Sequence, residues 1–542
     1  MGKLRVSFLV DSTKIQKWQR DLIEEIANDE SFVIDSILTP GMINAEEERK
    51  DSGSNNVLFK MYRGLDKKIF GSGLLDIVDV SSYQENYEFL RLDYKKVGYR
   101  DYINKDSIDN IKKRNIDVII RLGFRILSGE ILTSCKFGIW SFHHGDNRVN
   151  RGGPAGFWEI FNKETITGAT LQILNESLDG GTVIDKCFTR TRFYSLAKNK
   201  ECIIEASNIL ILSRLKKLNT SRSVNAVRDE RADNRPIDIY DRYIYLSPTF
   251  LQLMKYICVI SKEIYSMFFN KIFLRDEWFV AFKRYNKKSI NLSSLTILKN
   301  KKGYFKADPF LFKKEQKNWI FYEECKINNG KGWIEAYCIE DDVAFHVLEE
   351  AWHLSYPNVW RHNDNIYMMP QSDNGEVNVY ICEEFPSKWK LLNTVISSDK
   401  YQFGDPTLCV SGGKNVLLLT VYDNNLKAND HLYAISDVDV YEGQYTVDNL
   451  QLINSDVRNS RCAGKILKMG GYEYRIAQNC EEGYGVAINV NLLKDDLKGD
   501  LVESISPDFI KNANGVHTLN INDEYICVDF KKKKYDLYLG VK

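Results

Sequence analysis

The residues best suited to chemistry lie in two polar loops of the first half of the chain. Two adjacent histidines, His143 and His144, open the first loop, directly after the apolar segment 137–142. The second loop, 175–181, carries Asp179 and two glycines that let backbone approach a ligand closely. A histidine that exchanges a proton and a carboxylate that orients it form an acid-base pair. The sequence therefore predicts such a pair between a histidine of the first loop and Asp179.

The first loop also concentrates other polar side chains. The eleven residues from 141 to 151 include a serine, an aspartate and two arginines besides the histidines. Open α/β sheets bind ligands beyond the carboxyl ends of their strands, which is where this loop is expected. The residues predicted to bind substrate are His144, Asp146, Asn147, Arg148 and Arg151, with Ser141 beside them.

Strands that end at one edge of a sheet are needed to position these loops. Apolar strand-like runs alternate with helical stretches, such as 14–27, through the first 218 residues. The runs are 4–10, 116–124, 137–142 and 167–174. Strand and helix alternation predicts a mostly parallel sheet of the doubly wound, Rossmann type. We therefore expect an α/β catalytic domain over residues 1–218.

A linker and helical connector is expected over residues 219–275. Its first part is polar, and its apolar part, 250–274, carries four charged residues. Charges near the centre of a helix are costly in a bilayer. The segment is therefore predicted to be a helix packed between domains, and no membrane attachment is expected.

The remaining residues, 276–542, contain an internal repeat of a small-polar-proline turn followed by two strands. Its five anchor positions are Pro309, Pro357, Pro406, Ala463 and His517, which are 48, 49, 57 and 54 residues apart. Four-stranded units of roughly 40 to 50 residues are typical of propeller blades, since one blade cannot bury both of its faces. The repeat predicts a five-bladed β-propeller in which segment 278–285 completes the last blade. Two unrelated β-sandwiches are the alternative.

Composition excludes several classes of protein. The 542 residues contain 74 Lys plus Arg and 74 Asp plus Glu, and zero net charge disfavours general binding of nucleic acid. A hydrophobic fraction of 44% disfavours disorder. Eleven cysteines without a C-x-x-C pair fit neither a disulfide framework nor a zinc site, so no metal is expected. The cysteines and a start without a signal-peptide core predict a cytoplasmic location.

The first histidine loop and the residues after it resemble the formyltransferases that move a formyl group from formyl-tetrahydrofolate to an amine. The matching residues are His143, Arg151-Gly152, Pro154, Phe157-Trp158, Ile160, Asn162, Glu164 and the Leu-Asp-Gly-Gly run from Leu178. The resemblance covers about residues 1–215, and it implies that fold with His143 and Asp179 as catalytic residues. Ser141 stands where the family has its catalytic asparagine, and 145–148 replaces a Ser-Leu-Leu-Pro stretch. A serine hydroxyl is shorter than an amide, which weighs against a folate donor.

Together with the carboxyl-terminal repeats, this domain is similar to a narrower group, the nucleotide-sugar N-acyltransferases of the anthrose pathway. That resemblance implies acyl transfer from coenzyme A to the 4-amino group of a dTDP-linked 4-amino-4,6-dideoxyglucose. Ser141, the amides after His143 or His143 itself would stabilise the carbonyl oxygen. His143 either accepts the amine proton or positions the amine, and both roles stay open.

Both of these substrates carry pyrophosphate, so arginines are expected near the site. The residues predicted to bind the cofactor are Arg121, Gly123, Phe124 and Arg125, at the end of a central strand. Three alternatives remain: a formyl-tetrahydrofolate donor, a glycan-binding or scaffold protein, and transfer to initiator tRNA. Transfer to tRNA would require a basic carboxyl-terminal part that binds RNA. Small molecules are the expected partners, and the propeller is expected to shape the site of the first domain.

Overall fold

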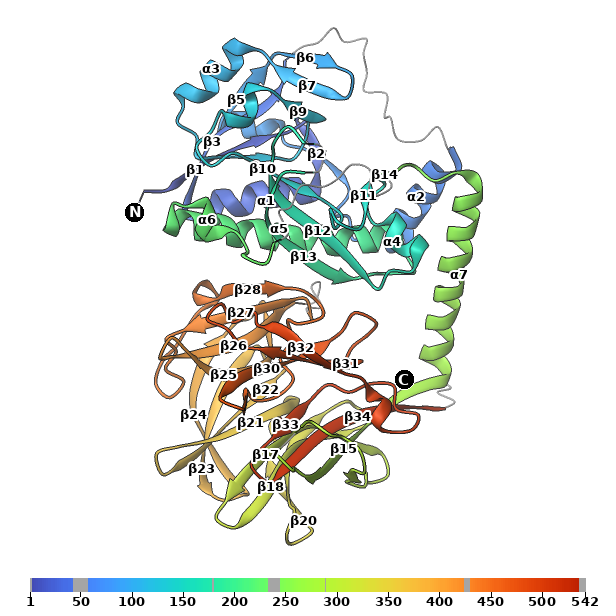
Figure 1. The fold of residues 1–542 in the computed structure, drawn as a ribbon, viewed down its shortest axis with the longest axis vertical. Helices are drawn as coiled ribbons and strands as arrows, with labels where there is room; N and C mark the ends of the chain where they lie inside the picture. The colour runs from blue at the N-terminus through green and yellow to red at the C-terminus, as the bar shows by residue number, and fades with distance from the viewer. Residues whose placement is uncertain are drawn as a thin grey trace. The chain divides into compact units, whose positions relative to one another are not determined.

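The computed structural model of this protein describes residues 2–41, 57–177, 180–232, 244–287, 289–423 and 429–535. The chain divides into two compact units, Met1–Tyr265 and Ser266–Lys542 (Figure 1). The division lies within the segment 219–275, which the sequence assigns to the connector.

A seven-stranded sheet forms the centre of the first unit. Its strands, in spatial order, are β13 (Thr182–Arg190), β12 (Ile166–Ile173), β10 (Ile139–His143), β8 (Val118–Arg121), β1 (Leu4–Leu9), β3 (Phe32–Pro40) and β5 (Glu88–Leu92). The five strands from β10 to β5 pair in parallel, whereas β12 and β13 pair antiparallel. The α/β unit with a mostly parallel sheet is therefore confirmed.

Helices bury both faces of this sheet. The principal helices are α1 (Lys17–Asn28), α2 (Val57–Phe70), α3 (Lys105–Lys113), α4 (Phe157–Asn162) and α5 (Leu196–Ser221). Helix α1 packs on β3 and on α5, and α5 packs on β12 and β13. Ile108 and Ile111 of α3 belong to another core cluster, with Leu9 and Ile119 of the central strands. Because both faces are covered, the central strands are apolar almost throughout, as is typical of parallel sheets.

The first helix begins later than its sequence pattern predicts. Residues Lys14–Gln16 form strand β2, which pairs with β4 (Ile77–Asp79). The helix starts at Lys17, and a capping box between Gln16 and Gln19 satisfies its first amides. The predicted start at residue 14 was wrong because a strand partner about sixty residues away competes for this segment.

The connector contains the long helix α7 (Phe250–Phe273). Its amino-terminal half is packed: Tyr256 is fully buried and stacks on Phe157 of α4 with ring centroids 4.2 Å apart. Leu253 and Ile260 lie in the same core cluster, one helical turn to either side. Within the described ranges, no helix is both long and apolar enough to cross a membrane.

Five four-stranded antiparallel sheets form the second unit. Four are consecutive strands: β17 (Tyr304–Lys314) to β20 (Val343–Leu348), β21 (Leu354–His362) to β24 (Lys388–Ser397), β25 (Gln402–Ser411) to β28 (Gln451–Ser455), and β29 (Leu467–Met469) to β32 (Asp500–Ile505). The fifth joins β15 (Leu274–Arg284) and β16 (Thr296–Ile297) to β33 (Leu519–Ile521) and β34 (Tyr525–Tyr535). The predicted recruitment of 278–285 into the last sheet is confirmed by the β15–β34 pairing.

The repeated proline turns have one backbone conformation in common. The residue before each of the three repeated prolines has a positive φ, namely 50° at Asp308, 47° at Tyr356 and 50° at Asp405. Each lies where the pairing of the first two strands of its sheet shifts register. A bulge of this kind redirects a side chain out of the strand pattern. Asp308 accordingly accepts a hydrogen bond from the Tyr356 amide of the next sheet, at 3.2 Å.

A buried ion pair fixes helix α5 to the sheet. Arg214 donates to Asp185 of β13, with 2.8 Å between Nε and Oδ2, and both side chains are less than 10% exposed. Removing one partner of a buried pair leaves an uncompensated charge.

We expect Arg214→Met to lower the free energy of unfolding of the protein by about 3 to 5 kcal/mol. The matched control is Lys216→Met, on the same helix, which breaks the half-exposed pair with Asp29 and should cost about 1 kcal/mol or less. Urea unfolding followed by circular dichroism measures both. Equal losses in the two variants would contradict the role assigned to the buried pair.

Candidate active site

Strands β8 and β10 end side by side and bring Arg121 next to Ser141. The two residues are paired in register, and Arg121 Nη1 donates to Ser141 Oγ at 3.2 Å. Nη2 of the same guanidinium donates to the carbonyls of Phe124, at 2.6 Å, and Arg125, at 2.5 Å. Arg121 therefore holds the loop after β8 and the Ser141 hydroxyl together. Its predicted contact with a cofactor stays a prediction.

His143 ends β10 on the same face as Ser141, since alternate residues of a strand share a face. Its Nε2 lies 2.8 Å from the carbonyl oxygen of Asn150. A carbonyl only accepts hydrogen bonds, so Nε2 carries the proton and the lone pair of the neutral ring is on Nδ1. The Asn150 side chain donates in turn to Glu164 Oε2 at 2.8 Å. The loop thus selects one tautomer of His143, in which Nδ1 is the basic atom.

Gly145 makes this closed loop possible. A Cβ at this position would lie 2.8 Å from both Asn150 O and His143 Nε2, closer than side chains approach such atoms. The chain therefore needs glycine where the histidine folds back on its own loop. Sequence reasoning missed Asn150 as the orienting residue, because a backbone carbonyl has no sequence signal.

His144 lies on the other face of β10 from His143. Its ring stacks on Phe142 at 5.8 Å and meets Trp18 of α1 edge-on at 5.7 Å. Within the described part of the chain, its buried Nε2 has no hydrogen-bond partner. Burial, and then the charges of Lys200 and His143, lower the pKa of His144 to about 3. His144 is therefore neutral at physiological pH and separated from the Ser141 and His143 face.

The segment after β8 is tied to the end of β1. The amides of Leu122 and Gly123 both donate to Leu9 O at 2.8 Å, and the Phe124 amide donates to Asp11 Oδ1 at 2.5 Å. A Cβ on Gly123 would lie 2.5 Å from the Asp11 amide nitrogen. The sequence predicted that Gly123 allows a cofactor to approach closely. In the structure, Asp11 of the chain itself lies there. Sequence reasoning missed Asp11, although it follows directly on the first strand.

The remaining residues predicted to bind ligands have separate surroundings. Asp146 pairs with Lys186 of β13 at 2.6 Å, and its carboxylate also accepts from the Arg148 amide at 2.9 Å. Asn147 is buried, and its amide donates to Thr170 Oγ1 at 3.3 Å.

Two predicted arginines are built into the fold of the first unit. Arg125 pairs with Asp101 of β7 (Arg100–Ile103) at 3.4 Å and donates at 2.7 Å to the carbonyl of Gly98, in the turn that joins β6 (Tyr94–Val97) to β7. Arg151 is only 2% exposed and pairs in parallel with Ile244 of β14 (Ile244–Tyr245). The structure thus brings together Ser141, His143 and Arg121. The Arg125 side chain instead contacts Asp101 and Gly98.

Asp179, the predicted partner of His143, lies outside the described residues, as does Leu178. The register shows where its loop begins: β12 runs antiparallel to β10, so Thr170 is opposite His143 while the strand continues to Ile173, opposite Trp140. The two loops therefore begin at opposite ends of this strand pair. The pairing of Asp179 with His143 stays a prediction.

Two ionisable groups of the first unit, one in α4 and one in α5, have pKa values shifted by burial. Burial, together with the charge of Glu164, raises the pKa of Glu159 in α4 to about 7. Burial, followed by the charges of Arg63 and Lys67, lowers the pKa of Lys200 in α5 to about 8. Sequence reasoning missed Glu159 and Lys200, because each lies within a segment whose residue pattern indicates a helix and no functional role.

Comparisons with known proteins divide the chain in two. Residues 293–514 match the family model described as "Glucosamine inositolphosphorylceramide transferase 1, N-terminal". Glucosamine inositolphosphorylceramide transferase 1 of Arabidopsis thaliana is 30% identical over 202 residues, which are 35% of this chain and 26% of the plant protein. The chain thus spans about a quarter of the length of that relative. Methionyl-tRNA formyltransferase of Clostridioides difficile (strain 630) is 39% identical over 94 residues, 17% of this chain and 29% of that protein.

Solved structures of formyltransferases also resemble part of the chain. Phosphoribosylglycinamide formyltransferase from Anaplasma phagocytophilum is 18% identical and aligns with 40% of this chain and 88% of its own, with a TM-score of 0.29. The enzyme of the same name from Bacillus halodurans is 15% identical and aligns with 40% of this chain and 97% of its own, with a TM-score of 0.29.

The pKa of Glu159 predicts how stability depends on pH. A carboxyl whose pKa is raised from 4.5 to about 7 on folding stabilises the native state while it is protonated, and this contribution is lost as pH rises from about 4.5 through 7. We expect Glu159→Gln to change the melting temperature little at pH 5 and to raise it at pH 8, by the equivalent of about 3 kcal/mol at most. Thermal unfolding across this range, with the exposed Glu30→Gln as control, measures the difference. Parallel curves for Glu159→Gln and wild type would contradict the assignment.

Proposed function

We propose that the first unit is an N-acyltransferase. It would move an acyl group from a coenzyme A thioester to the amino group of a nucleotide-linked amino sugar of the dTDP-4-amino-4,6-dideoxyglucose type. The observation that carries this proposal is the pair on one face of β10: the Ser141 hydroxyl and a His143 ring whose protonated Nε2 is bound by Asn150. This pair offers one hydrogen-bond donor and one basic nitrogen at a strand end.

Ser141 has the chemistry of a donor to the carbonyl oxygen. As the amine attacks the thioester carbon, negative charge develops on this oxygen, and a positioned donor typically contributes about 2.7 to 4 kcal/mol. The Ser141 oxygen accepts from Arg121, and among the described residues its own proton has one long contact, with Phe142 O at 3.5 Å. That proton can therefore turn to an oxyanion, and the neighbouring guanidinium makes it a better donor.

His143 has the chemistry of a base for the attacking amine. The new C–N bond forms, Nδ1 accepts the proton that the amine loses, and the C–S bond breaks to release a thiolate. The proton then passes from Nδ1 to the thiolate, so that His143 is neutral again and the thiol is released. General base catalysis of this kind contributes roughly 10²- to 10⁴-fold.

A specific finding favours a second donor, formyl-tetrahydrofolate. Three of the relatives similar in sequence are methionyl-tRNA formyltransferases, at 26 to 39% identity. Formyl transfer would use the same attack on a carbonyl carbon, with a folate nitrogen as leaving group. The substitution of Ser141 for the expected asparagine supports the coenzyme A donor instead.

For the second unit we propose a closed five-bladed β-propeller that serves as a scaffold. Five four-stranded sheets among the described residues, of which the last joins residues 274–284 to 525–535, support closure of the chain into a ring. The family model that matches residues 293–514 is described as "Glucosamine inositolphosphorylceramide transferase 1, N-terminal", and glycan binding by the propeller is the alternative.

Transfer should be visible as thiol release. We expect the purified protein, incubated with dTDP-4-amino-4,6-dideoxyglucose and acetyl- or hydroxybutyryl-coenzyme A, to release free coenzyme A in step with N-acylated sugar, detected by a thiol reagent and by mass spectrometry. Turnover of formyl-tetrahydrofolate with no thiol release would establish formyl transfer in its place. Failure with both donors would overturn the proposed class of reaction.

Replacing the proposed base should reduce turnover without loss of folding. His143→Asn keeps a donor toward Asn150 O but removes the basic Nδ1, so kcat should fall roughly 10²- to 10⁴-fold. The matched control is His362→Asn, an exposed histidine of the second unit, which should keep wild-type activity. Circular dichroism verifies that both variants fold. Activity near wild type in His143→Asn would remove the role from this residue.

A further inference from the structure

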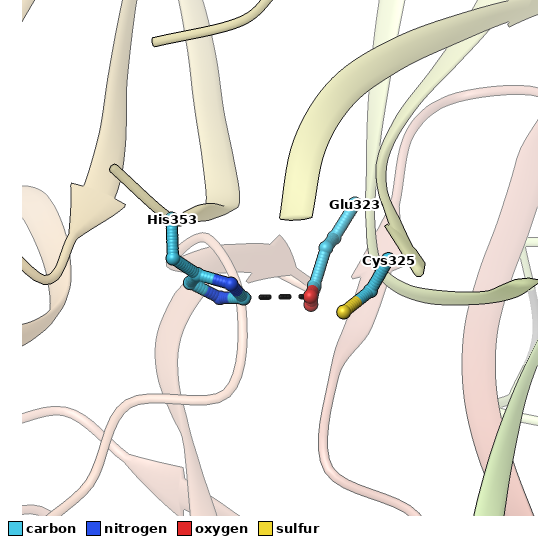
Figure 2. Close-up of side chains that lie close together, drawn as sticks. All are labelled: Glu323, Cys325 and His353. Atoms are coloured by element: carbon cyan, nitrogen blue, oxygen red, sulfur yellow. Dashed lines mark ion pairs between the residues drawn. The ribbon is translucent and has the colours of Figure 1, made fainter. Parts of the chain in front are cut away.

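Three side chains with metal-binding atoms meet in the second unit, away from the residues discussed so far. Glu323 and Cys325 are two apart on β18 (Lys317–Lys326) and share one face of it, and His353 lies just before β21 (Figure 2). One ligand atom from each lies within 4.8 Å of the other two. An oxygen, a sulfur and a nitrogen therefore surround one point.

The Glu323 carboxylate is buried, and its side-chain partners come from the same cluster. The residue is 6% exposed, and its carboxylate accepts from the Cys325 thiol. Its ion pair is with His353, at 3.6 Å between Oε1 and Nε2, which is longer than a hydrogen bond. Buried carboxylates are normally hydrogen-bonded, paired or bound to a metal.

His353 is oriented by backbone on the side away from Glu323. Its Nδ1 accepts from the Gly332 amide at 3.0 Å and also lies 3.0 Å from the Gly330 carbonyl oxygen. Metal binding through Nε2 requires the other tautomer, in which Nδ1 donates to the Gly330 carbonyl in place of the Gly332 contact and the lone pair of Nε2 faces Glu323 and Cys325 (Figure 2). A histidine that donates from one nitrogen to a backbone carbonyl and presents the other is the usual arrangement of a metal-binding histidine.

Space beside the three side chains is kept open by Gly332. A Cβ there would lie 2.8 Å from Glu323 Oε1 and 2.9 Å from His353 Cε1. The φ of Gly332 is outside the left-handed region, so its backbone conformation does not require glycine. The absence of a side chain is required by the close approach of Glu323 and His353 and of the Leu354 carbonyl oxygen, which would lie 2.8 Å from the Cβ.

The neighbouring cluster of Asp308, His517 and Asp529 differs because its partners satisfy one another. Asp529 accepts from the backbone amides of His517 and Thr518 with one oxygen, at 3.0 and 2.9 Å. Its other oxygen accepts from the Asp308 amide at 3.0 Å and pairs with His517 Nδ1 at 2.6 Å. This cluster is held by backbone amides and a short ion pair, whereas Glu323 is contacted by the Cys325 thiol and, at 3.6 Å, by His353.

We propose that Glu323, Cys325 and His353 bind a zinc ion. Thiolate, imidazole and carboxylate together suit a borderline-soft divalent ion, and three protein ligands leave one position for water. The Cys325 thiol, which is in no disulfide, loses its proton to solvent on binding. C-x-x-C spacing could not reveal this site, because its ligands come from one strand and a loop residue that lies 28 positions after Cys325. The proposal is independent of the reaction assigned to the first unit.

Zinc binding to the full-length protein tests this directly. Protein stripped with a chelator and supplied with zinc alone should retain about one zinc per chain after gel filtration, by elemental mass spectrometry. Cys325→Ser and His353→Gln should each weaken zinc binding roughly tenfold or more, whereas Cys382→Ser, at a half-buried cysteine elsewhere in the unit, should bind as wild type. Zinc binding unchanged in Cys325→Ser, or lost only in His517→Gln, would overturn the proposal.

Cobalt in the wild-type protein gives a readout that does not depend on the folding of any variant. A thiolate ligand to Co²⁺ produces a sulfur-to-metal charge-transfer band in the near ultraviolet, and one equivalent of zinc should abolish it. Gly332→Ala, which keeps all three ligands but fills the space between them, should weaken the band. A cobalt complex of the wild-type protein without the charge-transfer band would exclude Cys325 as a ligand and refute the site.

Discussion

The candidate active site depends on the Arg121 guanidinium. This one half-buried cation donates to the hydroxyl at the end of β10 and to two carbonyls of the loop after β8. A charged group withdrawn from water must satisfy its donors within the protein. Because its donors serve both a strand end and a loop, neither can shift without the other. The hydroxyl of Ser141 is thereby fixed beside a positive charge, which is the environment that a donor to an oxyanion needs.

The same requirement organises the second unit. Asp529 receives three backbone amides and a histidine, and Asp405 pairs with Arg461 at 2.5 Å, so each buried carboxylate joins segments that are far apart in the sequence. The repeated residue before proline, with its positive φ, directs Asp308 and Asp405 into these contacts. Glu323 differs, because among the described residues its contacts are the Cys325 thiol and a long ion pair with His353. A carboxylate, a thiol and an imidazole that face one another in this way are the groups that a zinc site uses.

Much of this could be predicted from local patterns. The alternation of a strand is enough to place Ser141 and His143 on one face, and the repeated proline turns mark four-stranded units correctly. Prediction failed where a segment distant in the sequence pairs with a predicted helix start, and where a strand runs antiparallel to its neighbour. Residues 14–16 pair with 77–79 instead of continuing a helix, and β12 runs antiparallel, so the loop of Asp179 does not start beside His143. Neither fact is encoded within a window of ten or fifteen residues.

The sequence by itself determined which segments are strands and helices, where the strands end, and which residue types are available there. Periodicity, turns and caps act over a few residues, so they can be read in order along the chain. Only the tertiary structure decided what each polar group binds: Asn150 selects the tautomer of His143, Asp11 occupies the space beside Gly123, and His353 meets Glu323 and Cys325. A hydrogen bond or a metal bond requires atoms within about 3 Å, and that depends on the register between segments that only folding brings together.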